Sequence, residues 1–209
     1  MRPLKIYLFL SAALLLAAGS SYAQQGELRL TASYAVGIPL GSFKDNIISK
    51  TSFRGADLNI LYGLTPKLSI GLTTGYQDFY EKYPRQVYKL EDGSDISAVL
   101  SNSIQQIPFL ATARYDFNTS GMIRPYALAG LGGQLILNRQ YLGEYTNEST
   151  NRFSFAARPE LGVYIPFGKE SQTGINLGAY YNYIPYNKGS IDNLNSVGIK
   201  LGIGFPMRN

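Results

Sequence analysis

The sequence predicts an all-β fold, an eight-stranded antiparallel up-and-down transmembrane β-barrel with short periplasmic turns and longer extracellular loops. Three observations lead to this prediction. Apolar and polar residues alternate in eight segments, an apolar leader precedes them, and short and long connections follow one another in turn. Successive side chains of a strand face opposite sides. Each segment therefore has an apolar face for lipid and a polar face for the lumen.

The leader has the pattern of a secretory signal peptide. Arg2 and Lys5 precede an apolar run that ends at the small residues of Ser21-Tyr22-Ala23. We therefore expect residues 1–23 to be removed and residues 24–209 to form one barrel domain. The chain contains no Cys, which excludes lipoprotein processing, disulfides and thiolate catalysis.

The eight alternating segments are each long enough for a tilted strand to cross a bilayer, which takes about 9–11 residues. They lie at 28–38, 54–64, 67–79, 103–117, 122–137, 152–166, 174–184 and 194–205. Three connections are tight turns, at 65–67, 118–121 and 168–173. Four are longer and polar, at 39–53, 80–102, 138–151 and 185–193. Because such barrels keep their short turns in the periplasm, we place both termini there.

Charged residues on the inward faces are expected to form a paired network in the lumen. These residues are Arg29, Asp57, Arg114, Asp116, Arg124, Arg158, Glu160 and Lys200. An eight-stranded barrel has room inside only for side chains, and charges there need partners to offset their desolvation. We predict a salt-bridged polar core rather than an anion pore, with Arg114, Asp116, Arg158 and Glu160 at its centre.

Aromatic residues are predicted to form two girdles at the level of the lipid headgroups. Beside the short turns and the C-terminus we expect Tyr62, Tyr115, Phe117, Phe167 and Phe205. Toward the long loops we expect Tyr76, Phe79, Tyr80, Phe153, Phe155, Tyr181 and Tyr183.

Composition narrows the classes of function. The formal net charge is +5, but the cations are scattered singly, which argues against nucleic-acid binding. The chain has no His, so the catalytic imidazole of most hydrolytic enzymes is missing. We predict no catalytic residues, no cofactor and no metal site. Glu91, Asp92 and Asp95 leave one alternative open, a cation site in place of a solvated acidic turn.

Three phrases of the sequence resemble a known family. The phrases at 107–115 (IPFLATARY), 123–132 (IRPYALAGLG) and 158–163 (RPELGV) are similar to the small outer-membrane β-barrel domain proteins of Bacteroidota, which include PorT-like proteins and relatives of the OmpA and OmpX barrels. The last segment resembles the signal read by the barrel-insertion machinery, with Lys200, Gly202 and Phe205 at the matching positions.

Taken together, the pattern and the resemblance predict a non-enzymatic barrel in the cell outer membrane. We expect a structural, adhesion or envelope-assembly role, with a secretion-system role suggested by the PorT-like relatives. The expected partners are outer-membrane lipid, the barrel-insertion machinery during assembly, and an envelope or surface protein; the barrel is expected to be a monomer. Two alternatives remain, a small pore or hydrophobic-ligand transporter, and a soluble secreted β-barrel binding protein.

Overall fold

The structure is a computed structural model that describes residues 26–89, 95–142, 145–168, 171–188 and 191–207. The predicted signal peptide lies outside the described residues, and so do Glu91 and Asp92 of the acidic loop. No helix in the described part of the chain combines the length and the apolar character needed to cross a membrane.

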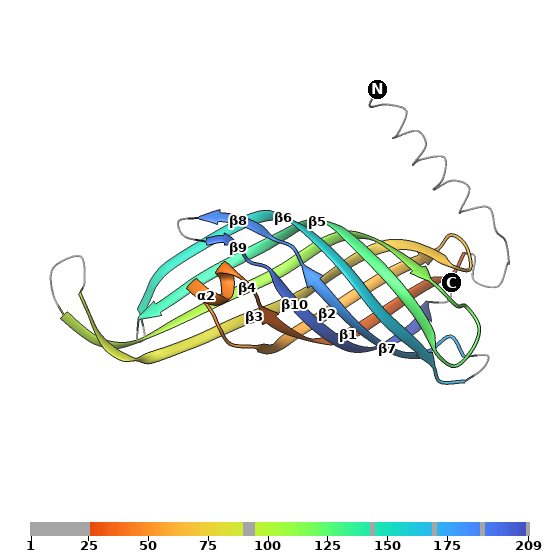
Figure 1. The fold of residues 1–209 in the computed structure, drawn as a ribbon, viewed down its shortest axis with the longest axis horizontal. Helices are drawn as coiled ribbons and strands as arrows, with labels where there is room; N and C mark the ends of the chain where they lie inside the picture. Colours follow the sequence, from red (N-terminus) through yellow and green to blue (C-terminus); the bar gives the residue numbers. More distant parts are fainter. Residues whose placement is uncertain (1–25, 90–94, 143–144, 169–170, 189–190, 208–209) are drawn as a thin grey trace, which may run out of the picture.

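Eight antiparallel strands close into one barrel, in the order β1-β10-β7-β6-β5-β4-β3-β2 (Figure 1). The strands are β1 (Leu28–Pro39), β2 (Ser52–Gly63), β3 (Leu68–Lys89), β4 (Asp95–Asp116), β5 (Arg124–Leu142), β6 (Tyr145–Pro166), β7 (Gly174–Asn182) and β10 (Ser196–Met207). Each strand pairs with its neighbours along this sequence, and the first and last pair with each other. The predicted fold class is confirmed.

Closure is accompanied by a stagger of the strands. If the pairing is followed from Gly174 through β10 and once around the ring, it returns to Ala156 on β6. Gly174 itself pairs with Pro166 on that strand. Such a stagger is what tilted strands need in order to close into a barrel.

Four strands extend far beyond the other four at one end of the barrel. We predicted loops at 80–102 and 138–151, and this prediction is wrong for most of their described length. There β3 pairs with β4, and β5 pairs with β6, almost to the tips of the strands (Figure 1). A ladder of backbone hydrogen bonds continues beyond the bilayer regardless of side-chain polarity, so a polar composition there does not signal a loop. We call this part of β3–β6 the four-stranded extension.

The other two long connections also contain regular structure. The connection at 39–53 includes the short helix α2 (Ser42–Asn46), and the connection at 185–193 forms a hairpin of β8 (Pro185–Lys188) and β9 (Ile191–Asn193). Leu40 N–H donates to the Asn195 carbonyl and Leu194 N–H to the Ile184 carbonyl. Both connections are therefore tied to the mouth at the same end as the extension.

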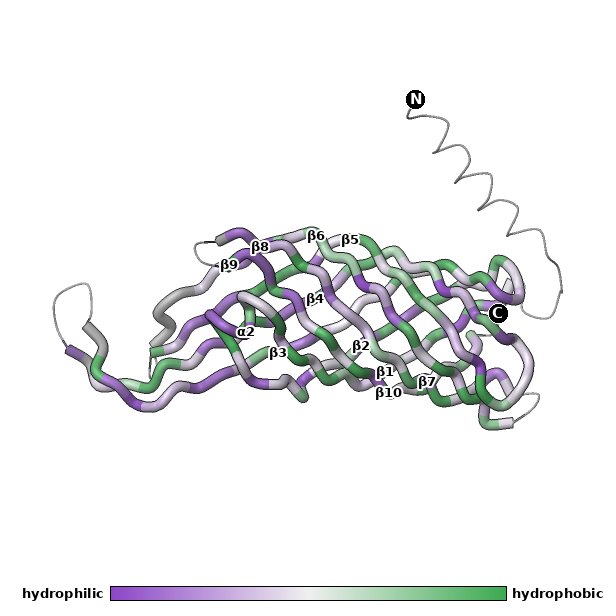
Figure 2. The backbone as a smooth tube through the Cα atoms, viewed as in Figure 1, coloured by the Kyte–Doolittle hydropathy of each residue, from purple (hydrophilic) through white to green (hydrophobic). Residues whose placement is uncertain are grey.

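The outward faces are apolar, as the alternation predicts. On β10 the outward Ile199, Leu201 and Ile203 are exposed, whereas the alternating Lys200 is buried in the lumen. Figure 2 shows the same alternation of hydrophobic and hydrophilic residues along the other barrel strands. An exposed apolar surface all around a closed barrel with a polar interior is the arrangement that lipid requires.

The two aromatic girdles are present, with one exception. The other predicted members have outward rings that are exposed or half-buried. The prediction that Phe79 belongs to a girdle is wrong, because its ring is 0% exposed and lies inside the barrel. Residues 77, 79 and 81 of β3 all point into the barrel. The position of Phe79 in this alternation therefore decides its direction, and the preference of an aromatic ring for the headgroup level does not.

A charge on the lipid face is expected to be costly. Leu201 lies near the middle of β10 and is 57% exposed toward lipid. We predict that Leu201→Arg destabilises the barrel by about 2–4 kcal/mol, because it places a charged side chain in hydrocarbon near the bilayer midplane. Urea unfolding in phosphatidylcholine vesicles measures this cost.

Met207→Arg is the control for depth. It changes the same face of the same strand, but at the end of the barrel. Its cost should be about 0–1 kcal/mol. Equal costs at the two positions would contradict the assignment of this face to lipid.

Candidate functional site

The middle of the lumen holds a chain of four alternating charges. Arg158 Nη1 donates to Asp57 Oδ2, and Lys200 Nζ lies 2.9 Å from Asp57 Oδ1 and 2.8 Å from Glu160 Oε2. All four side chains are almost fully buried. They come from β2, β6 and β10, so the chain of charges spans the lumen.

Neutral polar groups complete this network. Asn59 Nδ2 donates to Asp57 Oδ1 at 2.8 Å, and Arg158 Nε donates to Asn182 Oδ1 at 2.7 Å. On the other side, Tyr126 OH donates to Glu160 Oε1 at 2.7 Å. Because buried ions are costly unless their remaining hydrogen-bonding positions are used, these contacts help to offset the desolvation of the four charges.

A second ion pair lies toward the short turns. Arg114 donates from Nε and Nη2 to Asp116 Oδ1, at 3.0 and 2.7 Å. Its guanidinium carbon lies 3.9 Å from the centre of the Tyr126 ring, so Tyr126 connects this pair to Glu160. The predicted centre was Arg114, Asp116, Arg158 and Glu160. The structure places Arg158 and Glu160 in the chain of four charges, with Asp57 and Lys200 where Arg114 and Asp116 were expected.

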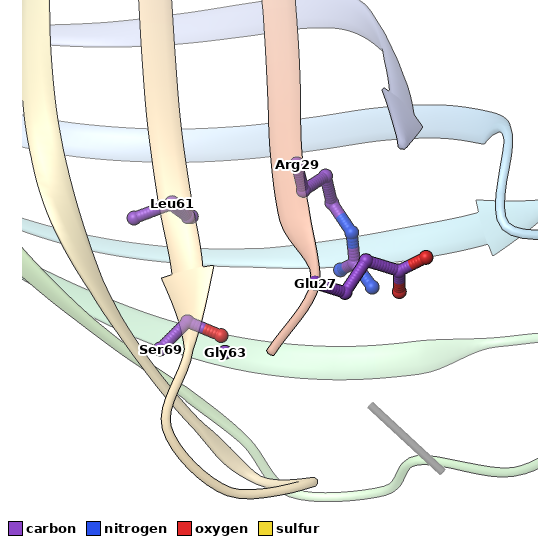
Figure 3. Close-up of a pocket in the computed structure, with 5 residues that line it drawn as sticks. All are labelled: Glu27, Arg29, Leu61, Gly63 and Ser69. Carbon is purple, nitrogen blue, oxygen red and sulfur yellow. The ribbon is translucent and has the colours of Figure 1, made fainter. Parts of the chain in front are cut away.

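The remaining two predicted lumen cations lie nearer the rim. Arg29 lies at the short-turn mouth beside Glu27, with Leu61 of β2 and Ser69 of β3 nearby (Figure 3). Its guanidinium carbon is 5.1 Å from the centre of the Tyr164 ring. Arg124 is half-buried, and its Nε donates to the Gly121 carbonyl at 3.4 Å. No ion pair within the described residues joins Arg29 or Arg124 to the chain of four charges.

The opposite mouth is closed by an apolar cluster that sequence reasoning missed. We call it the mouth plug, and its buried members are Phe43, Ile47, Ile48, Phe79, Ile104, Leu110, Ile136, Ala156, Ile184, Tyr186 and Leu194. Phe43 comes from α2 and meets Phe79 edge to face, with ring centroids 4.9 Å apart. The alternation of β3 and β4 places the apolar residues 79, 104 and 110 on the inward face, and this pattern could have revealed the mouth plug.

Hydrogen bonds hold the α2 connection in this position. The Ser42 hydroxyl donates to the Asn193 carbonyl at 3.1 Å, and Ser49 N–H donates to Glu81 Oε2 at 2.6 Å. Tyr83 OH donates to the Ile47 carbonyl at 2.6 Å. Burial raises the pKa of the Tyr83 phenol, and the nearby Glu81 carboxylate raises it further, so this phenol remains a donor at neutral pH.

Little space remains between the charges and the plug. Gln77, Gln106 and Gln134 face this region, where a cavity of about 10 Å³ has room for about one water molecule. Charges, glutamines and plug thus fill the lumen over the described residues. The arrangement binds side chains of different strands to one another across the lumen.

The predicted assembly-signal residues lie on the final strand. Lys200 points into the lumen, Gly202 is buried against β1, and Phe205 is partly exposed near the end of the barrel. That they form a signal for the insertion machinery stays a prediction, as does the monomeric state.

Metal binding was left open for the acidic loop. Within the described residues no group of three or more acidic side chains is placed to hold a metal ion. Glu91 and Asp92 lie outside these residues, so the loop itself stays untested.

A closed barrel with an apolar outside and a filled polar lumen defines the class of outer-membrane barrels. The chain belongs to the outer membrane protein beta-barrel domain family, whose model matches residues 9–205. The protein is therefore located in the outer membrane, and the alternative of a soluble secreted barrel is wrong. No curated protein matches the sequence.

Several solved structures share the fold. Ail, the attachment invasion locus protein of Yersinia pestis, is 15% identical with a TM-score of 0.52, over 88% of this chain and 99% of that one. OprG from Pseudomonas aeruginosa is 14% identical with a TM-score of 0.52, over 89% and 98%. Neisserial surface protein A is 18% identical with a TM-score of 0.51, over 86% and 95%. At these identities the likeness concerns the fold alone.

Proposed function

We propose that the protein is a non-enzymatic, non-conducting anchor that presents its four-stranded extension to a macromolecular partner outside the cell. The observation that carries this proposal is the combination of a filled lumen with strands that outrun the barrel wall on one side only (Figure 1). Binding residues concentrate on segments that a rigid scaffold holds in place. The scaffold here is the barrel, and the extension is the part that reaches beyond the membrane.

The extension offers a surface suited to contact. Val87 on β3 is 65% exposed, and Arg85 beside it is exposed as well. Both side chains lie on paired strands that project beyond the barrel wall, so the scaffold holds them in place for a partner. That the neighbour Ail carries attachment and invasion in its name supports adhesion as the kind of role.

The resemblance to PorT-like barrels of Bacteroidota supports a finer version of this proposal. In that version the partner is another envelope protein of the same cell, and the barrel serves an envelope or secretion assembly. The two versions differ in the partner and share the mechanism, a passive scaffold that holds a binding surface at the membrane.

Photo-crosslinking on intact cells tests the proposal. A photoreactive residue at position 87 should capture a protein, and the captured protein tells adhesion from envelope assembly. The matched control is position 60 on β2, an outward residue of the barrel wall that should contact only lipid. Equal protein capture at both positions, or none at position 87, would contradict the role of the extension.

Conductance tests the alternative of a small pore. Planar-bilayer recordings of the purified barrel should show no stable single-channel steps, because ion pairs and the mouth plug occupy the lumen. Reproducible steps would favour the pore instead.

A further inference from the structure

We infer that the outward face at the base of the extension binds the phosphate headgroup of an outer-leaflet lipid, through Arg54 and Arg139. We call Arg54, Tyr76, Tyr80 and Arg139 the outer-interface cluster. The mouth plug and the lumen charges face inward, so they take no part in this site.

A β-bulge aims Arg54 at this surface. Ala35 pairs with Gly55 and Gly37 with Ser52, so the single residue between them on β1 faces both Phe53 and Arg54 on β2. As a result both of these side chains are exposed, although alternation would bury one of them. Bulges commonly re-aim a side chain in this way beside functional sites.

Arg54 is held in place while most of its guanidinium stays free. Its Nη1 lies 3.2 Å from Asp78 Oδ2, and its guanidinium carbon lies 5.3 Å from the centre of the Tyr80 ring. Asp78 is itself fixed, since the Ser103 hydroxyl donates to its Oδ1 at 2.9 Å. The Arg54 side chain is nevertheless 64% exposed. Guanidinium has five N–H donors, so several remain for a ligand.

Arg139 approaches the same place from β5. Tyr80 pairs with Ser103, which pairs with Arg139, so two strand spacings of about 4.8 Å separate Tyr80 from Arg139. Arg54 and Arg139 are both exposed on the outward face of the barrel. This face therefore carries two exposed arginines and one buried carboxylate, Asp78, which leaves an excess of positive charge, and the exposed Lys82 adds to it.

The depth of the cluster favours a lipid headgroup over a free anion. The outward pairs formed by Ile107, Leu135 and Phe153 are apolar. The next outward pairs toward the extension place Asp78 beside Gln105. The cluster thus begins where the lipid-facing band ends, the level at which headgroup phosphates and aromatic rings lie. Arginine also binds phosphate well, because its planar fork can donate two hydrogen bonds at once.

Native mass spectrometry of the detergent-solubilised barrel with lipid A tests this inference. Arg54→Gln and Arg139→Gln should each weaken lipid A binding about tenfold, the loss expected for one charge-assisted hydrogen bond. Arg54→Lys should recover only part of the affinity, since a point charge replaces a fork. The matched control is Lys67→Gln, which removes an exposed cation from a turn at the opposite end and should leave binding unchanged.

Two further arms identify the source of the phosphate and control for folding. Dephosphorylated lipid A should bind weakly to the unaltered protein and to all variants alike, and inorganic phosphate should bind far more weakly than lipid A. Among the described residues no ion pair involves Arg139, so Arg139→Gln keeps the test valid if Arg54→Gln fails to fold. Equal lipid A binding by Arg139→Gln and Lys67→Gln, or free phosphate binding as tightly as lipid A, would overturn the inference.

Discussion

Asp57→Asn is expected to destabilise the barrel by about 3–5 kcal/mol, because it leaves two buried cations with one buried anion. Asp57 is the link between Arg158 and Lys200, and its side chain is only 4% exposed. The substitution keeps the shape of the side chain, so the loss reports the charge. Urea unfolding in phosphatidylcholine vesicles measures it.

A compensating substitution distinguishes charge balance from packing. Asp57→Asn combined with Lys200→Met leaves Arg158 and Glu160, one buried charge of each sign. The double variant should be more stable than the sum of the two single costs predicts, by a coupling of about 0.5–3 kcal/mol. Asp192→Asn, an exposed acid on β9, serves as the control and should change stability by less than about 0.5 kcal/mol. Additive costs would contradict a shared network.

Phe79→Ala is expected to cost about 3–5 kcal/mol, the range for truncating a buried aromatic ring. The ring is 0% exposed and packs against Phe43 of α2. Its loss should also loosen the α2 connection. Hydrogen exchange of the amide of Ile47, which donates to the Phe43 carbonyl, reports that loosening.

Val87→Ala is the matched control for the mouth plug. It truncates an apolar side chain on the same strand, but one that points into water, so its cost should stay within about 0.5 kcal/mol. A similar cost at positions 79 and 87, or unchanged exchange at Ile47, would mean that Phe79 does not hold the mouth closed.

The barrel itself could be predicted because alternation fixes the face of each residue. Leu72 and Thr73 are neighbours, and a period of two suffices to send the first to lipid and the second to the lumen. Depth along the barrel was harder to predict. The stagger of the strands decides which inward charges meet, and alternation carries no information about stagger. For this reason Asp57 and Lys200 were recognised as lumenal, but their central place was not.

The mouth plug and the extension were missed for different reasons. Phe43, Ile47 and Ile48 lie in a connection whose apolar residues have no strand period, so nothing in the sequence linked them to the inward face of β3. The extension has a polar composition on strands that no lipid covers. There the backbone ladder keeps the strands paired, and hydropathy is a poor guide.

The ion pairs of the lumen also constrain the order in which the chain can fold. Asp57 lies on the second strand and Lys200 on the last, so the two charges meet only after β10 has docked against β1. A sheet without β10 would leave Asp57 and Glu160 without Lys200 and would bring an excess of carboxylates toward hydrocarbon, at a high cost. We therefore expect intermediates lacking the final strand to be poorly tolerated in the bilayer, which makes ring closure and membrane entry a single cooperative event.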